Sequence, residues 1–512
     1  MRNIEKEYRL ILAVILIFSA IVYIYHLDKE SLSTDEYLSL FSVQQSPHDI
    51  FYKHKSVLNP NTIPPLYFLI LHYWVKLFGT SDFVQRSLSV IFGILSIYSL
   101  YRLTRMLFDI RTGIFSALFG ALSYNWFLLF RQDRSYSLLI LLSLLSFYAF
   151  FYLIKNKNSK YPIFYLTIIN ILLAYTHYFS FLIIILEALF GIFEYRKDKK
   201  GLTAIIWMFL IVAIAYLPWY SNLFYDFRRE PIIIEREHNV TVSRIIFDIF
   251  RITFSDFHFI WSPMLTIIYI PFIIRGIVKL RGKFSHELRH LPAYLILIFI
   301  IPFIFLYLVI FTDRERYYAA FMFPLLILLS LGIQDLHIKG IIGKLFVLSI
   351  GVFIISNNVL DFADFFNSPS DEKWKQASGI IKQIKAHSDS ADILIFQTKY
   401  NPPVFAYYFW GPETAAHFIQ TVATGEINDK AIREANIKEK IYLIGEMKGK
   451  QFFEKLASLP DDSFIWLFRY HDIYFANDFR VENQNRYFFH KIQLNKALEP
   501  IDVYLLRRII RN

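Results

Sequence analysis

The chain has 512 residues, of which 55% are hydrophobic and 19% aromatic, and it contains no cysteine. Soluble proteins average about 45–50% apolar residues, and disordered chains and disulfide-stapled scaffolds have other compositions. The lack of cysteine also excludes thiol catalysis and thiolate metal sites. The net charge is +11, which suits the basic cytoplasmic loops of a membrane protein, so we expect no nucleic-acid partner. The composition predicts an integral membrane protein.

Apolar segments that could cross a bilayer recur over most of the chain. A helix needs about 20 apolar residues to span the hydrocarbon core. The first segment, residues 10–27, follows Arg2, Lys6 and Arg9 and ends without a small-residue cleavage site, which indicates an uncleaved anchor with a cytoplasmic N-terminus. Further stretches bring the expected total to about eleven spans: 83–103, 112–130, 136–154, 161–176, 179–193, 202–220, 263–279, 291–311, 317–336 and 341–357.

Residues 64–78 are also apolar, but the segment is short and begins with two prolines. If it does not cross, the basic loops that follow residues 101, 154, 195, 278 and 338 all face the cytoplasm, as the positive-inside bias requires. We therefore expect an interfacial or half-inserted element here. Residues 242–257 show a pattern typical of a second interfacial helix, because isoleucines alternate at helical spacing with charged residues.

The character of the chain changes near residue 360. Residues 361–512 are too polar to span a membrane and follow an outward-going segment, which predicts an extracytoplasmic soluble domain. Short apolar runs alternate with helical stretches there, which indicates an α/β domain: 393–396, 441–444, 464–468, 487–492 and 503–506. The predicted fold class is a polytopic α-helical membrane domain over 1–358, followed by a soluble α/β domain over 359–512.

Two adjacent carboxylates stand at the start of the first outer loop, in Ser33-Thr34-Asp35-Glu36. The spacing predicts a capping box, with Ser33 at the N-cap and Glu36 at N3 of a helix. Alternatively, Asp35 is a general base that accepts the proton of a substrate hydroxyl. The two interpretations are compatible, since a cap at Ser33 would hold Asp35 at the start of the helix.

Acids and arginines alternate in two other outer loops, around Asp133 and around Arg314 and Arg316. Such runs are ordinarily local ion pairs on a hydrated turn. If the two loops share a site, their guanidinium groups could instead neutralise a leaving phosphate.

Two further polar residues lie near or within the spans. His177 is either an interfacial residue or, with Asp35 and Asp133, a ligand for a divalent cation; no spacing motif decides, so metal and cofactor stay open. Glu187 lies within a predicted span, where it either has a function or forms hydrogen bonds inside the helix bundle.

In their order and spacing, these motifs resemble the GT-C glycosyltransferases of the protein O-mannosyltransferase and aminoarabinose (lipid A) transferase type. The resemblance covers about the first 340 residues. Relatives usually have His where this chain has Ile63, and many have Glu-Ala-Arg at Gln132-Asp133-Arg134. The similarity rests on Asp35-Glu36, Ile63-Pro64-Pro65-Leu66-Tyr67, residues 74–86 and 131–138, Tyr175-Thr176-His177-Tyr178, and Arg316-Tyr317 before Pro324.

The resemblance implies an inverting enzyme that moves a hexose or pentose from a polyprenyl-phosphate carrier to an acceptor hydroxyl. Its active site would face outward from the cytoplasmic membrane. Asp35 would be the base, with Glu36 beside it, and Asp133 the second acid. The implied substrate- and phosphate-binding residues are Arg131, Arg134, His177, Arg314, Arg316 and Tyr317.

The implied partners are the lipid-linked sugar donor, membrane lipids, and an acceptor that is a glycan, a lipid or a protein. The alternative function is transport or flipping of lipid-linked glycans, which predicts ionisable residues spread through the spans. A third possibility is a polytopic scaffold that displays the C-terminal domain.

Overall fold

The computed structural model describes residues 2–52, 64–156, 161–229, 262–280, 289–309, 315–334, 356, 359–363, 365–366, 378, 382, 393–396, 401–411, 415, 440–443, 465–470, 487–492 and 501–508. The chain divides into two compact units. The first comprises Met1–Leu27 and Ile63–Phe365, and the second comprises Asp28–Thr62 and Phe366–Asn512. The first outer loop, which the sequence assigns to the membrane domain, therefore groups with the C-terminal part of the chain.

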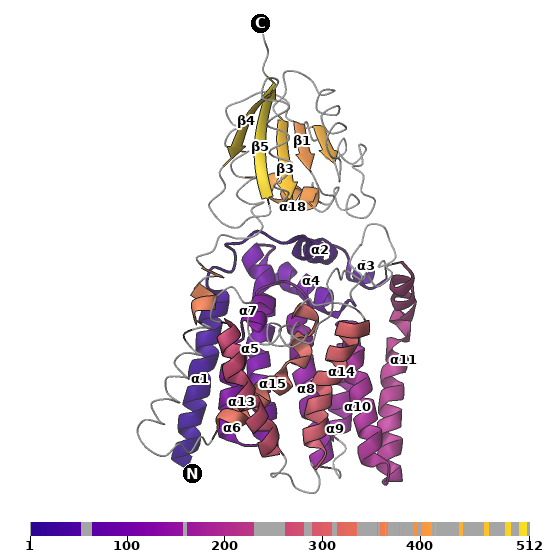
Figure 1. Cartoon of the computed structure of the whole chain (residues 1–512). Helices are drawn as coiled ribbons and strands as arrows, with labels where there is room; N and C mark the ends of the chain where they lie inside the picture. Colours follow the sequence, from indigo (N-terminus) through magenta and orange to yellow (C-terminus); the bar gives the residue numbers. More distant parts are fainter. Residues whose placement is uncertain are drawn as a thin grey trace, which may run out of the picture. The chain divides into compact units, whose positions relative to one another are not determined.

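The first unit is a bundle whose long helices run roughly parallel in Figure 1. Its helices are α1 (Arg2–Ile24), α4 (Leu66–Phe78), α5 (Asp82–Leu107), α6 (Ile110–Leu122), α7 (Tyr124–Phe130), α8 (Tyr136–Lys155), α9 (Tyr161–Ala174), α10 (Ser180–Tyr195), α11 (Lys199–Arg229), α13 (Ser262–Leu280), α14 (Leu291–Ile304) and α15 (Phe323–Ile333). A π-helical turn, η3 (Phe305–Val309), and two 3-10 turns, η4 (Glu315–Tyr317) and η5 (Ala319–Phe321), lie between the last two.

The composition of these helices makes the chain an integral membrane protein. Within the described residues, four helices are long and apolar enough to cross a membrane, or five if the bent pair α6–α7 is one span. Four shorter apolar helices accompany them: α4, α9, α14 and α15. Residues 242–257 and 341–355 lie outside the described part of the chain, so the second interfacial helix, the last span and the total of about eleven stay predictions.

The predicted span over residues 112–130 is not one straight helix. It breaks at Ser123 into α6 and α7, which meet at a bend of 64°. Ser123 ends α6, and its hydroxyl accepts a hydrogen bond from the Trp126 N–H at the start of α7. A side-chain cap satisfies a backbone donor that the new helix leaves without an intrahelical partner, which stabilises the break.

The predicted span over residues 317–336 is likewise shorter than expected. Its first residues form the 3-10 turns η4 and η5, and α15 begins only at Phe323. Pro324 lies in the first turn of α15, where its missing N–H breaks no helical hydrogen bond. Trp126 donates from Nε1 to the carbonyl of Ala319 at 3.2 Å, which ties α7 to these turns.

The second unit contains helices α2 (Thr34–Val43), α3 (Pro47–Tyr52) and α18 (Asn401–Phe409). Its strands are β1 (Ile393–Phe396), β2 (Lys440–Leu443), β3 (Ile465–Tyr470), β4 (Tyr487–Ile492) and β5 (Ile501–Arg508). They form one sheet in the order β2-β1-β3-β5-β4. Strand β1 is parallel to β2 and β3, whereas β5 is antiparallel to β3 and β4. The five strands overlap the apolar runs that the sequence analysis names.

Candidate functional site

The capping box predicted at the start of α2 is present. The Glu36 N–H donates to Ser33 Oγ at 3.2 Å, and Glu36 Oε2 accepts the Ser33 N–H at 2.9 Å. The carboxylate of Glu36 is thus engaged in the cap, and the residue is only 3% exposed. Asp35 is half-buried at the first turn of α2, on a helix start that the cap makes rigid.

Helix α18 of the same unit contacts the start of α2. The Leu32 N–H donates to the Tyr408 hydroxyl oxygen at 2.7 Å. The rings of Tyr37 and Tyr407 lie with their centroids 6.1 Å apart. Helix α18 therefore contacts the segment that carries Asp35 both before the N-cap, at Leu32, and after it, at Tyr37.

In the first unit, Arg131 binds the end of α1. Its Nη1 donates to the carbonyls of Tyr23 and Tyr25, both at 2.8 Å, and its Nη2 donates to the His26 carbonyl at 3.0 Å. A helix C-terminus leaves carbonyl groups without intrahelical donors, and a buried arginine satisfies several of them. Arg86 adds another such contact, to the Leu27 carbonyl at 2.9 Å. We therefore leave Arg131 out of the candidate phosphate site.

Asp133 and Arg134 lie in the turn between α7 and α8. Asp133 is fully buried and Arg134 is 6% exposed. Helix α8 begins at Tyr136, and its N-cap residue Ser135 makes no side-chain capping hydrogen bond. The turn therefore presents a buried guanidinium beside the positive end of a 20-residue helix.

Three loops that the sequence assigned to the outer side meet in this unit. The ring centroids of Tyr136 and His177 lie 5.5 Å apart, and Tyr317 lies 6.3 Å from Tyr136 and 6.4 Å from His177. Phe179 contacts both His177 and Tyr317, each at 5.1 Å. The guanidinium carbon of Arg316 lies 5.4 Å from the centre of the Tyr317 ring. The predicted residues His177, Arg316 and Tyr317 are thus neighbours, whereas Arg314 lies outside the described residues.

The groups around His177 favour the neutral form of its imidazole. Burial, together with the charges of Arg134 and Arg316, lowers its pKa from 6.5 to about 3. Its Nδ1 accepts the Phe179 N–H at 3.2 Å, so the ring proton resides on Nε2. The site therefore combines two guanidinium groups with a neutral N–H donor, a set that favours an anion such as a phosphate.

The described residues offer no group of three or more His, Asp or Glu side chains placed as metal ligands. Of the three candidates, Asp35 belongs to the second unit, and Asp133 and His177 belong to the first. A metal site therefore stays a hypothesis from the sequence.

Comparison with known proteins gives a consistent result. Residues 62–221 match the model of the dolichyl-phosphate-mannose-protein mannosyltransferase family. No curated protein sequence matches the chain. ArnT from Cupriavidus metallidurans in the apo state superposes with a TM-score of 0.56 at 11% identity, over 96% of this chain and 97% of that chain. Its complex with undecaprenyl phosphate gives 0.50 at 12% identity, with the same coverage.

The archaeal oligosaccharyltransferase AglB from Archaeoglobus fulgidus, solved with an inhibitory peptide and a dolichol-phosphate, gives a TM-score of 0.53 at 12% identity. The match covers 78% of this chain and 63% of that one, which is less than two thirds of its length. The chain has the GT-C fold. The resemblance read from the sequence motifs is thereby confirmed.

Three serines near the site were not predicted from the sequence. The hydroxyls of Ser135, Ser137 and Ser180 are buried without a hydrogen-bond partner in the described residues. Ser135 and Ser137 flank Tyr136 at the start of α8, and Ser180 begins α10. Their position within three residues after Arg134 and His177 is the signal that could have identified them. Buried hydroxyls without partners are costly, and a ligand oxygen would satisfy them.

Glu187 of the GT-C bundle belongs to a buried hydrogen-bond network. Ser146 donates to Glu187 Oε1 at 2.8 Å, and Asn170 donates from Nδ2 to Glu187 Oε2 at 2.9 Å. The network joins α8, α9 and α10, and the last two of these helices flank the His177 turn. Of the two roles left open for Glu187, the structure supports hydrogen bonding within the bundle.

Proposed function

We propose that this protein transfers a sugar from a polyprenyl-phosphate carrier to an acceptor hydroxyl, with inversion at the anomeric carbon. The observation that carries the proposal is the group formed by Arg134, Arg316 and neutral His177 at the start of α8. The family model and the shared fold support the same class of reaction. ArnT, which has this fold, has been solved with undecaprenyl phosphate.

The chemistry of the leaving group explains why these residues suit the reaction. Breaking the bond between the anomeric carbon and the phosphate oxygen leaves a negative charge on the carrier phosphate. Arg134 and Arg316 neutralise that charge, and His177 donates a hydrogen bond from Nε2. In a buried site, loss of one such donor costs about 10²–10³ in rate. Tyr317 is half-buried beside them and contacts the sugar or the phosphate.

Asp35 is the proposed base. The acceptor oxygen bonds to the anomeric carbon, the carbon–phosphate-oxygen bond breaks, and the acceptor proton passes to the Asp35 carboxylate. Glu36 suits this role less, because the cap at Ser33 engages its carboxylate. Asp35 and the phosphate group must face opposite sides of the anomeric carbon for inversion. Asp133, which is fully buried and precedes Arg134 in the same turn, is the proposed second acid.

The proposed location follows from the charge of the loops. The active site and the soluble domain lie outside the cytoplasmic membrane, where nucleotide sugars are absent and a lipid-linked donor is required. The proposed boundaries are 1–358 for the membrane domain and 359–512 for the soluble domain. The acceptor is a glycan, a lipid or a protein that carries a free hydroxyl.

Replacement of Asp35 by Asn tests the proposal. We expect Asp35→Asn to lower transfer at least 100-fold, while the full-length variant still inserts in the membrane. The measurement is mass spectrometry of lipid-linked sugars in membranes of a deletion strain that expresses each variant: Asp35→Asn should accumulate the donor as the deletion does. The matched control is Glu36→Gln, which keeps the capping geometry and should restore transfer. Wild-type transfer by Asp35→Asn would overturn the proposal.

The same experiment separates the enzyme from a transporter of lipid-linked glycans. A transporter moves its cargo without breaking the sugar–phosphate bond, so the carrier would not be released from its sugar. We therefore expect free polyprenyl phosphate to form in wild-type membranes supplied with donor and acceptor, but not in Asp35→Asn membranes. The hydrogen bonds that engage Glu187 within the bundle favour the enzyme over the transporter.

A further inference from the structure

One face of α5 exposes an apolar stripe that ends at a cation. Ile91, Leu95 and Tyr98 are 39%, 44% and 38% exposed, and Arg102 follows at the same helical spacing and is also exposed. Residues three or four positions apart lie on one face of a helix. The stripe is therefore a lipid-facing surface of the bundle that terminates in a guanidinium group.

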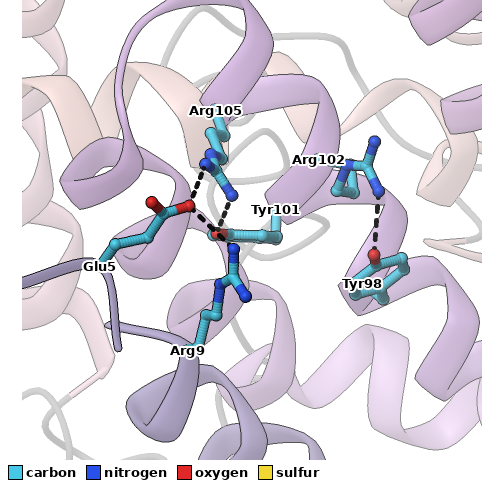
Figure 2. A network of polar contacts seen from close by, with 6 residues as sticks. All are labelled: Glu5, Arg9, Tyr98, Tyr101, Arg102 and Arg105. Carbon is cyan, nitrogen blue, oxygen red and sulfur yellow. Dashed lines mark hydrogen bonds and ion pairs between the residues drawn. The ribbon is translucent and has the colours of Figure 1, made fainter. Parts of the chain in front are cut away.

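Arg102 is fixed by two tyrosines from different helices. Its Nη1 donates to the Tyr98 hydroxyl at 3.0 Å, and its Nη2 donates to the Tyr148 hydroxyl of α8 at 3.5 Å. Its guanidinium carbon lies 5.8 Å from the centre of each ring. Figure 2 shows Arg102 above Tyr98. Because a guanidinium has five N–H donors, most of the donors of Arg102 are left without a partner in the described residues.

Other cations surround the same helix ends. Arg105 and Arg9 both bind Glu5, at 2.9 and 3.1 Å, and Figure 2 shows the three side chains together. Lys155, at the end of α8, is exposed and reaches the Met106 carbonyl at 3.5 Å. In the described part of the chain, Glu5 is the only carboxylate that binds these four cations, and its charge is already shared between two arginines.

We propose that Arg102 binds the phosphate of an acidic phospholipid whose acyl chains lie along the exposed face of α5 and α8. The guanidinium suits the phosphate because it donates in a planar fork. Tyr148 and the 41% exposed Tyr152 of α8 border the stripe, and tyrosine is enriched where acyl chains meet headgroups. The basic loops assign this boundary to the cytoplasmic leaflet. The site is separate from the proposed transfer reaction, which uses the opposite boundary.

Lipid retention by the full-length protein tests this site. Protein purified in detergent is incubated with palmitoyl-oleoyl phosphatidylglycerol or with the corresponding phosphatidylcholine, and bound lipid is counted by native mass spectrometry. We expect wild type to retain phosphatidylglycerol and release phosphatidylcholine. Arg102→Gln should weaken phosphatidylglycerol binding about fivefold, since one cation near a membrane surface contributes about 1 kcal/mol. Arg102→Lys should lose less, because the charge stays.

Lys200→Gln is the matched control, because Lys200 is an exposed cation on α11 and lies outside the group around Arg102. It should retain phosphatidylglycerol as wild type does. Equal retention by wild type and Arg102→Gln would overturn the proposal, as would equal retention of the two lipids by wild type. Displacement of phosphatidylglycerol by undecaprenyl phosphate at equal concentration would also overturn it, because the site would then belong to the carrier.

Discussion

The backbone N–H of Leu32 donates a 2.7 Å hydrogen bond to the hydroxyl oxygen of Tyr408, which lies 376 residues later in the chain. Leu32 directly precedes the N-cap of the helix that carries Asp35. The C-terminal part of the chain therefore contributes to the position of the proposed base. This relationship gives the C-terminal part of the chain a role that its sequence does not suggest.

Replacement of Tyr408 by Phe removes the acceptor and keeps the ring. The Leu32 N–H then lacks its partner, which costs about 1–3 kcal/mol for a buried donor. We expect amide exchange in the peptide around Leu32 to accelerate about tenfold, measured by hydrogen–deuterium exchange of the full-length protein. Transfer should fall through kcat, with the donor KM unchanged. Tyr52→Phe, the same change at an exposed tyrosine of α3, should alter neither, and unchanged exchange in Tyr408→Phe would contradict the prediction.

Arg131 and Arg134 lie three residues apart but should respond differently to replacement by Gln. Arg131→Gln removes hydrogen bonds to the carbonyls of Tyr23, Tyr25 and His26, so we expect the thermal unfolding temperature to fall by several degrees. Arg134→Gln should lower donor turnover about 100-fold. Thermal melts and transfer assays of both variants check this. If Arg131→Gln kept wild-type stability and lost donor binding alone, Arg131 would have to return to the phosphate site.

The pKa of His177 predicts how stability depends on pH. His177 titrates at 6.5 in the unfolded chain and at about 3 in the folded one, so the unfolded state binds its proton first as the pH falls. The contribution is complete above pH 6.5 and is lost between pH 6.5 and 3. The loss amounts to about 2 kcal/mol at pH 5. His177→Asn, which cannot titrate, should lose less stability than wild type between pH 7 and pH 5 in parallel melts. An equal loss in both proteins would contradict the low pKa.

Glu187 provides a test of the buried network. Glu187→Gln keeps an oxygen for Asn170 or Ser146 and should cost little, whereas Glu187→Leu leaves the Asn170 Nδ2–H without its acceptor; Ser146 keeps Asn170 Oδ1 as an acceptor at 2.9 Å. We expect the leucine variant to lower the free energy of unfolding by about 1–3 kcal/mol more than the glutamine variant. Unfolding of the two variants in detergent measures the difference. Equal stability would show that the network contributes little.

The sequence alone determined those features that depend on residues close together in the chain. The capping box of Ser33 and Glu36 needs only a spacing of three residues, and the structure contains it. Long apolar helices such as α5 and α8 follow from composition, because a bilayer requires continuous apolar surface. The motifs around Asp133 and His177 predicted the fold family for the same reason: they are contiguous stretches of chain.

Tertiary structure decided which of those residues act together. Arg131 and Arg134 stand in one motif, yet only the position of α1 shows that Arg131 binds its carbonyls. The partners of Glu187 come from two other helices, and Tyr408 reaches Leu32 across most of the chain. Hydrogen bonds of this kind depend on helix packing, which brings distant segments to within about 3 Å. The spacing of residues in the sequence carries no information about such distances. The motifs could therefore identify candidate residues, but only the fold shows which of them are neighbours.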